Sequence, residues 1–99
     1  MKKRVLINGN KIISKSELYP YLEQVFKLSY PIGHNLDALW DTLSTTKTLQ
    51  KITIIHSNKL SDNLGEYAQS LFDLFNVLKT KRNIEIKIYK GKRNETNRT

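Results

Sequence analysis

The chain has 99 residues, a hydrophobic fraction of 38% and no cysteine, so one modest folded domain is expected and disulfides and thiolate metal sites are excluded. The mean hydropathy is −0.52, and no apolar run approaches the length of a membrane span. The formal net charge of +8 would by itself indicate a nucleic-acid-binding protein, so the position of the charges has to be considered.

The positive charge is concentrated at the two ends of the chain. Residues 1–4 carry three cations and residues 79–99 carry a net charge of +6, whereas residues 5–78 carry a net charge of −1. Two long windows, residues 28–46 and 60–78, contain no Lys or Arg and hold five of the nine acidic side chains. The basic ends can attract polyanions, but the two acidic windows need a separate explanation.

The first part of the chain predicts a strand, a turn and a helix. Residues 4–7 form a short segment that is apolar after Arg4, which is typical of a buried strand, and Asn8-Gly9 is a turn signal that could close a hairpin with residues 11–13. Ser16 is the expected N-cap of the first helix, and Pro20 weakens its first turn. The apolar spacing places four side chains on the buried face of this helix: Leu18, Leu22, Val25 and Phe26.

The second part of the chain predicts two more strands with a long helix between them. Residues 51–56 are rich in β-branched side chains and their apolar run is nearly continuous, as in a strand, and residues 57–62 are expected to form a loop. Residues 64–78 have the spacing of an amphipathic helix, followed by a lysine-rich end that suits a helix C-terminus. Residues 83–89 alternate between apolar and polar, which favours a strand at the edge of a sheet. Residues 90–99 have no apolar side chain, so a disordered basic tail is expected.

Strands separated by helices predict parallel pairing in a small α/β domain. We expect residues 1–89 to form this single domain and residues 90–99 to form the tail. The chain begins with cations like a secretory signal peptide, but its apolar run ends after three residues at Asn8, which favours a cytosolic protein.

The sequence shows no pattern typical of an enzyme or of a cofactor site. The two histidines, His34 and His56, lack metal-ligand spacing, and each is better explained as a surface or strand-end residue. A phosphate-binding loop and a glycine-rich dinucleotide turn are both absent from the sequence, and no nucleophile accompanies the acidic residues. We therefore expect a protein that is not an enzyme and that binds no cofactor and no metal.

The most unusual stretch of the chain is residues 33–43. It begins with Gly33, which gives the chain turning freedom after a loop over residues 28–33, and Asn35 is a suitable helix cap. At about 100° per residue, the following helix gathers four apolar side chains on one face: Leu36, Leu39, Trp40 and Leu43.

Two carboxylates, Asp37 and Asp41, stand side by side on this helix next to Trp40, and Ala38 and Thr42 complete its outer surface. Like charges four positions apart disfavour a helix by a few tenths of a kcal/mol. A solvated acidic face beside a core tryptophan is one explanation. The absence of any Lys or Arg from residues 28–46 favours another, in which the carboxylates bind a cationic partner.

The run from Gly33 to Asp41 resembles the signature of the barstar family, intracellular inhibitors of barnase-type ribonucleases, and the likeness extends over residues 3–89. The resemblance implies three parallel strands packed with helices, and inhibition by the motif helix and the loop before it. By resemblance, Asp41 enters the catalytic centre of the ribonuclease, where its carboxylate takes the place of an RNA phosphate, and Asp37 pairs with a nearby cation. The remaining predicted ribonuclease-binding residues surround these two: Gly33, Asn35, Leu36, Trp40, Ala38, Thr42, Tyr30 and His34.

Three features depart from the family pattern. Pro31 and Ile32 replace two tyrosines before the glycine, with Tyr30 close by, and Val77 replaces a late-helix glutamate that helps to bind the enzyme. The familiar inhibitor is acidic, whereas this chain has a net charge of +8. These departures bear on which ribonuclease is the target more than on how it is inhibited.

Two hypotheses follow from the sequence. In the first, the chain is a cytoplasmic inhibitor that blocks the active site of a secreted or toxin-type ribonuclease in a 1:1 complex, while its tail binds polyanions weakly. In the second, it is a basic RNA-associated protein that works through residues 2–4 and 79–99, and the motif is only structural.

Overall fold

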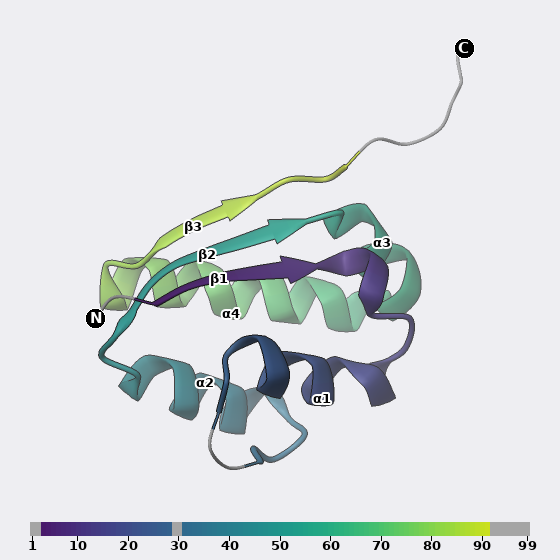
Figure 1. Ribbon diagram of the computed structural model, residues 1–99. Helices are drawn as coiled ribbons and strands as arrows, with labels where there is room; N and C mark the ends of the chain where they lie inside the picture. Colours follow the sequence, from purple (N-terminus) through teal and green to yellow (C-terminus); the bar gives the residue numbers. More distant parts are fainter. Residues whose placement is uncertain (1–2, 29–30, 92–99) are drawn as a thin grey trace.

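The computed structural model describes residues 3–28 and 31–91. In this part of the chain the elements follow in the order β1 (Lys3–Asn8), η1 (Gly9–Lys11), α1 (Lys15–Val25), α2 (Leu36–Thr45), β2 (Leu49–Ile55), α3 (Ser57–Leu64), α4 (Glu66–Arg82) and β3 (Glu85–Ile88). Figure 1 shows the three strands side by side, with α4 running along one face of the sheet and α1 and α2 beyond its β1 edge. The predicted α/β fold with three parallel strands is confirmed.

The sheet has the order β1-β2-β3, and both pairings are parallel. Alternate residues of each strand point toward the helices, which explains why Val5, Ile52 and Ile86, aligned across the three strands, are all buried. The residues between them point to the opposite face of the sheet. β3 lies at an edge of the sheet, as its alternating sequence predicts.

Helix α1 is attached to the free edge of β1. The backbone N–H of Asn8 donates to the Tyr21 hydroxyl at 2.8 Å, and the Lys3 ammonium donates to the Phe26 carbonyl at 2.8 Å. These contacts cover an edge that would otherwise present unpaired backbone groups. The helix begins two residues earlier than predicted, because Ser14 rather than Ser16 occupies the N-cap position.

The predicted hairpin after β1 is wrong. The chain turns through η1 instead, and Ile12 enters the hydrophobic core rather than a second strand. Gly9 is required here, since a Cβ at this position would lie 2.2 Å from the His56 carbonyl oxygen. The turn is therefore packed tightly against the end of β2.

The predicted loop over residues 57–62 is also wrong, because these residues belong to α3. The first helical N–H groups, those of Ser57 and Asn58, donate to the backbone carbonyls of Tyr89 and Lys90 at 3.0 and 3.2 Å. These partners come from a distant part of the chain, and they satisfy groups that a local cap would otherwise serve. The long helix α4 consequently begins only at Glu66, after Gly65 with φ +60°.

The hydrophobic core lies between the sheet and the helices. Its largest fully buried side chains include Tyr19 and Phe26 on the α1 side and Phe75 on α4. Most of the predicted tail, residues 92–99, lies outside the described residues. No helix in the described ranges has the length and apolar character needed to cross a membrane.

Candidate functional site

Helix α2 begins where its sequence predicts. Asn35 has an extended backbone, with φ −152° and ψ 164°, and its side-chain oxygen accepts a hydrogen bond from the Ala38 N–H at 2.8 Å. The Asn35 carbonyl also accepts from the Leu39 N–H at 3.1 Å, the first bond of the helix. The cap therefore fixes both the start of α2 and the direction in which the preceding loop leaves it.

The buried face of α2 is centred on Leu39. Leu39 and Leu43 are completely buried, whereas Leu36 and Trp40 are partly buried and pack against the core from the side. Thr42 is only 7% exposed, so its predicted place on the outer surface is wrong. The reason is geometric, because Thr42 lies about 60° from Leu39 on the helix and shares its buried side.

Asp37 and Asp41 lie on the side of α2 that faces away from the core, and both are exposed. Within the described ranges, 3–28 and 31–91, no Lys, Arg or His side chain lies within ion-pair distance of either carboxylate. Asp37 is in the first helical turn, where the helix dipole favours an anion. The helix thus presents two carboxylates that are available to a cation from another molecule.

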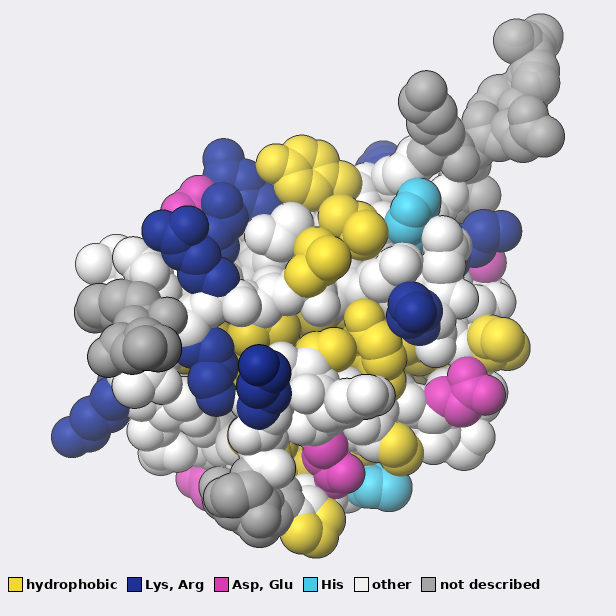
Figure 2. Space-filling model, viewed as in Figure 1, with side chains coloured by type: hydrophobic (Ala, Val, Ile, Leu, Met, Phe, Trp, Pro, Cys, Tyr) yellow, Lys and Arg dark blue, Asp and Glu magenta, His cyan; other side chains and the backbone are white. Residues whose placement is uncertain are grey.

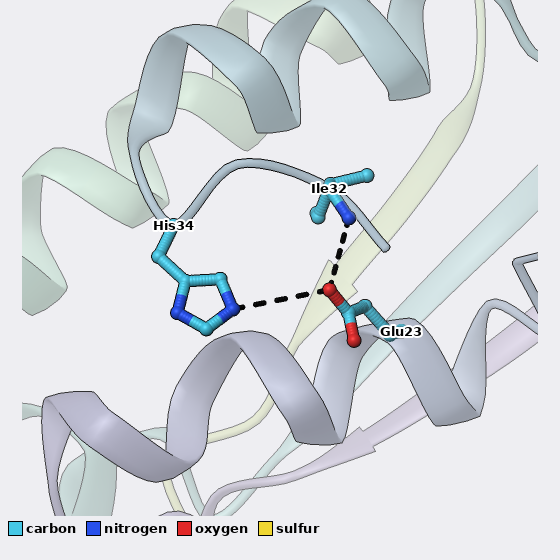
Figure 3. A network of polar contacts seen from close by, with 3 residues as sticks. All are labelled: Glu23, Ile32 and His34. Carbon is cyan, nitrogen blue, oxygen red and sulfur yellow. Dashed lines mark hydrogen bonds and ion pairs between the residues drawn. The ribbon is translucent and has the colours of Figure 1, made fainter. Parts of the chain in front are cut away.

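Glu23 of α1 holds the loop that precedes α2. One of its carboxylate oxygens accepts a hydrogen bond from the Ile32 N–H at 2.9 Å, and the same oxygen lies 4.0 Å from His34 Nε2 (Figure 3). Ile32 is itself buried, so the loop is fastened by a core side chain as well as by this hydrogen bond. The loop is therefore held against α1 on both sides of Gly33.

Tyr19, also on α1, contacts a face of the His34 ring. The two rings are stacked, with centroids 5.4 Å apart and planes inclined by 10°. The buried Tyr19 hydroxyl is hydrogen-bonded to the Tyr67 hydroxyl, and Lys15 Nζ lies 4.3 Å from the centre of the Tyr67 ring. Burial, reinforced by the Tyr67 hydroxyl, raises the pKa of Tyr19 well above its usual value, so this phenol stays neutral.

Gly33 lies in close contact with the start of α2. A Cβ at this position would lie 3.2 Å from the Ala38 Cβ and 3.3 Å from the Asn35 side-chain nitrogen, closer than an ordinary contact. Any larger residue would therefore press on the cap that begins the helix. Tyr30 lies outside the described residues.

The departures from the family pattern have different structural consequences. Ile32 is buried and presents no side chain at the surface, whereas Pro31 is exposed. Val77, which the resemblance predicts to replace the family's glutamate, is 45% exposed on α4. An apolar side chain thus stands where a charged contact is expected.

A family model described as Barstar (barnase inhibitor) matches residues 2–90. The chain belongs to the barstar family. Members of this family are inhibitors that bind barnase-type ribonucleases, and not enzymes. The described ranges also contain no group of three or more His, Asp or Glu side chains that could hold a metal ion.

The sequence predicts a binding surface on α2, but it does not predict the two residues of α1 that hold the loop. Glu23 and Tyr19 are four positions apart and so lie on the same side of α1, facing the loop. Nothing in their local sequence indicates the partners, because His34 and Ile32 come close only after α1 and the loop have packed together.

Proposed function

We propose that this chain is an intracellular protein that blocks the active site of a barnase-type ribonuclease in a 1:1 complex. The contact surface consists of α2 and the loop before it. The observation that carries this proposal is the pair of exposed carboxylates, Asp37 and Asp41, with no basic partner among the described residues. Membership of the barstar family supports the same function.

A ribonuclease of this kind must bind RNA phosphates with cationic side chains. A carboxylate fixed on a helix can accept the same charge-assisted hydrogen bonds, and a guanidinium can donate two of them in parallel. In this proposal Asp41 occupies the phosphate position in the catalytic centre, and Asp37 pairs with a neighbouring cation. Because α2 is capped and packed before the partner arrives, little conformational entropy is lost when the carboxylates bind.

The residues around the two carboxylates would form the rest of the contact surface. Trp40 and Leu36 supply the exposed parts of partly buried apolar side chains, and Asn35, His34 and Gly33 belong to the supported loop. Ala38 lies at the edge of the surface, and Tyr30 remains a sequence-based expectation. Thr42 is left out of this surface because it is buried.

Electrostatic attraction would guide the encounter of the two proteins. The absence of Lys and Arg from residues 28–46 keeps repulsive charges out of this segment, as attraction to the cationic cleft of the ribonuclease requires. The rest of the chain is strongly basic, so a target with a less basic exterior around that cleft would fit best. This would account for a +8 member of the family.

The test is inhibition of RNA cleavage by a barnase-type ribonuclease, measured with the full chain and with Asp41→Ala. The loss of hydrogen bonds to a charged partner should cost about 2 kcal/mol of binding free energy, which corresponds to inhibition weakened by about 30-fold or more. Asp62→Ala removes a carboxylate from α3 and is the matched control, with little expected effect. Equal losses from both variants, in proteins that stay folded, would exclude the phosphate-mimic role of Asp41.

A further inference from the structure

The face of the sheet opposite α4 carries no helix over most of its area (Figure 1). The side chains that alternate with the buried ones point outward on this side, and we call the surface they form the outer sheet face. The outer sheet face includes the side chains of Arg4, Leu6, Lys51, Ile55, Lys87 and Tyr89. Figure 2, which views this face, shows Lys and Arg side chains gathered where the strands begin and hydrophobic side chains beside them.

The cations on the outer sheet face come from all three strands. Arg4 is paired with Lys51 in the register of β1 and β2, and Lys87 follows one row further along β3. Neighbouring strands are about 4.8 Å apart, so these charges lie close together. Glu85 is 3.8 Å from Lys51 Nζ and 3.9 Å from Lys87 Nζ, which leaves one carboxylate to be shared by two lysines. The face therefore keeps a net positive charge.

Large apolar side chains are exposed next to these cations. Leu6 and Tyr89 are each 53% exposed, although most of the other large apolar side chains in the described ranges are buried or packed on the core. Tyr89 is held in place, because its backbone N–H donates to the Ile54 carbonyl at 2.8 Å and its own carbonyl accepts from Ser57. Its ring is thus presented from a fixed backbone at the end of β3.

A shallow groove between β1 and α1 continues the outer sheet face. It is lined by Leu6, Tyr21 and Val25 together with two further cations, Lys11 and Lys27. Cations and apolar side chains therefore lie side by side on one surface, which is the composition of a site for unpaired nucleic acid.

We infer that the outer sheet face is a second binding surface, and that it binds single-stranded RNA. Arg4, Lys51 and Lys87 contact phosphates, and an unpaired base stacks on the Tyr89 ring. An acidic protein would use the cations alone, whereas RNA also uses the exposed aromatic ring. The contact surface of α2 is separate, because α2 lies beyond the β1 edge of the sheet and packs against α4 rather than on the outer sheet face.

The charge component is tested by fluorescence anisotropy with the full chain and a labelled oligouridylate of about ten nucleotides. Lys51→Ala combined with Lys87→Ala should weaken binding by roughly ten-fold at low salt. It should also make the plot of log affinity against log salt shallower by about 1.4, the value for two phosphate contacts. Lys59→Ala combined with Lys79→Ala removes the same charge from α3 and α4 and should have a much smaller effect. Equal losses from the two pairs would overturn the assignment to this face.

The stacking component is tested with Tyr89→Ala, Tyr89→Phe and heparin, a polyanion without bases. Tyr89→Ala should weaken RNA binding by roughly ten-fold and leave heparin binding unchanged, and Tyr89→Phe should restore RNA binding. Unchanged RNA binding by a folded Tyr89→Ala protein would overturn the inference. Tighter binding of polyglutamate than of the oligouridylate would also overturn it, in favour of an acidic protein partner. Ribonuclease inhibition, measured on the same variants, tests the α2 surface independently.

Discussion

Glu23 shows how a single side chain can prepare a binding loop from a neighbouring helix. It does not lie on the predicted contact surface, yet it accepts the Ile32 N–H at 2.9 Å and faces His34 at 4.0 Å. Tyr19 stacks on a face of the same histidine ring. A loop held in this way loses less conformational freedom when it meets a partner, so Glu23 is expected to affect inhibition without touching the enzyme.

Glu23→Ala should therefore weaken inhibition and lower the free energy of unfolding. The lost hydrogen bond involves a charged acceptor, which corresponds to about 1.5 kcal/mol of stability. Glu23→Gln keeps an acceptor for the Ile32 N–H. It should therefore restore most of the inhibition and most of the free energy of unfolding. Urea unfolding and inhibition assays on the two variants make the comparison. If Glu23→Ala behaves like the unchanged protein in both, the loop does not depend on this side chain.

Tyr19 predicts how stability depends on pH in the alkaline range. Its pKa is raised in the folded protein above the ordinary tyrosine value of about 10, because the phenol is buried and bonded to Tyr67. Above about pH 10 the unfolded chain releases this proton while the folded chain retains it, so the free energy of unfolding falls as pH rises. Urea unfolding at about pH 8 and pH 11 should show this decline. It should be smaller in Tyr19→Phe and unchanged in Tyr89→Phe, and an equal decline in all three proteins would contradict this role of Tyr19.

At the scale of elements, α2 was predictable because its signals are local. The cap at Asn35 and the spacing of Leu36, Leu39 and Leu43 are read directly from the sequence, and both carboxylates lie on the exposed side as expected. Thr42 is buried because the side of α2 that packs on the core is centred on Leu39, about 60° from Thr42 around the helix. Helix periodicity fixes relative directions along a helix, but packing decides which direction faces the core.

The elements that were mispredicted depend on contacts between distant parts of the chain. Helix α3 begins with N–H groups that bond to the carbonyls of Tyr89 and Lys90, which no local pattern reveals. The turn after β1 depends on the close approach of Gly9 to the His56 carbonyl. The support of the binding loop by Glu23 also joins separate parts of the chain, so no local pattern predicts it.

The cap of α2 gives a prediction at this scale. Asn35→Ala removes the acceptor of the Ala38 N–H, and the loss of an N-cap should cost about 1 kcal/mol of stability. Inhibition should also weaken, because the first turn carries Asp37. Urea unfolding and inhibition assays measure the two effects, and Asn76→Ala, on the exposed side of α4, is the matched control. A stable Asn35→Ala protein with unchanged inhibition would show that the cap is dispensable.

The whole molecule separates opposite charges onto different surfaces. The exposed carboxylates lie on α2, beyond the β1 edge of the sheet, and cations from three strands lie on the outer sheet face. The net charge of +8 therefore does not conflict with an acidic contact surface for a ribonuclease. The sequence predicted the charge segregation along the chain, whereas the convergence of Arg4, Lys51 and Lys87 required the sheet register.

Competition with a mononucleotide tests the central claim, that the carboxylates of α2 occupy the phosphate-binding cleft of the ribonuclease. Calorimetric titration would compare the binding of this protein to the free enzyme and to the enzyme saturated with a mononucleotide. Mutually exclusive binding predicts that the apparent Kd rises in proportion to the nucleotide concentration. An apparent Kd that does not change with nucleotide, in a complex that still forms, would contradict the account.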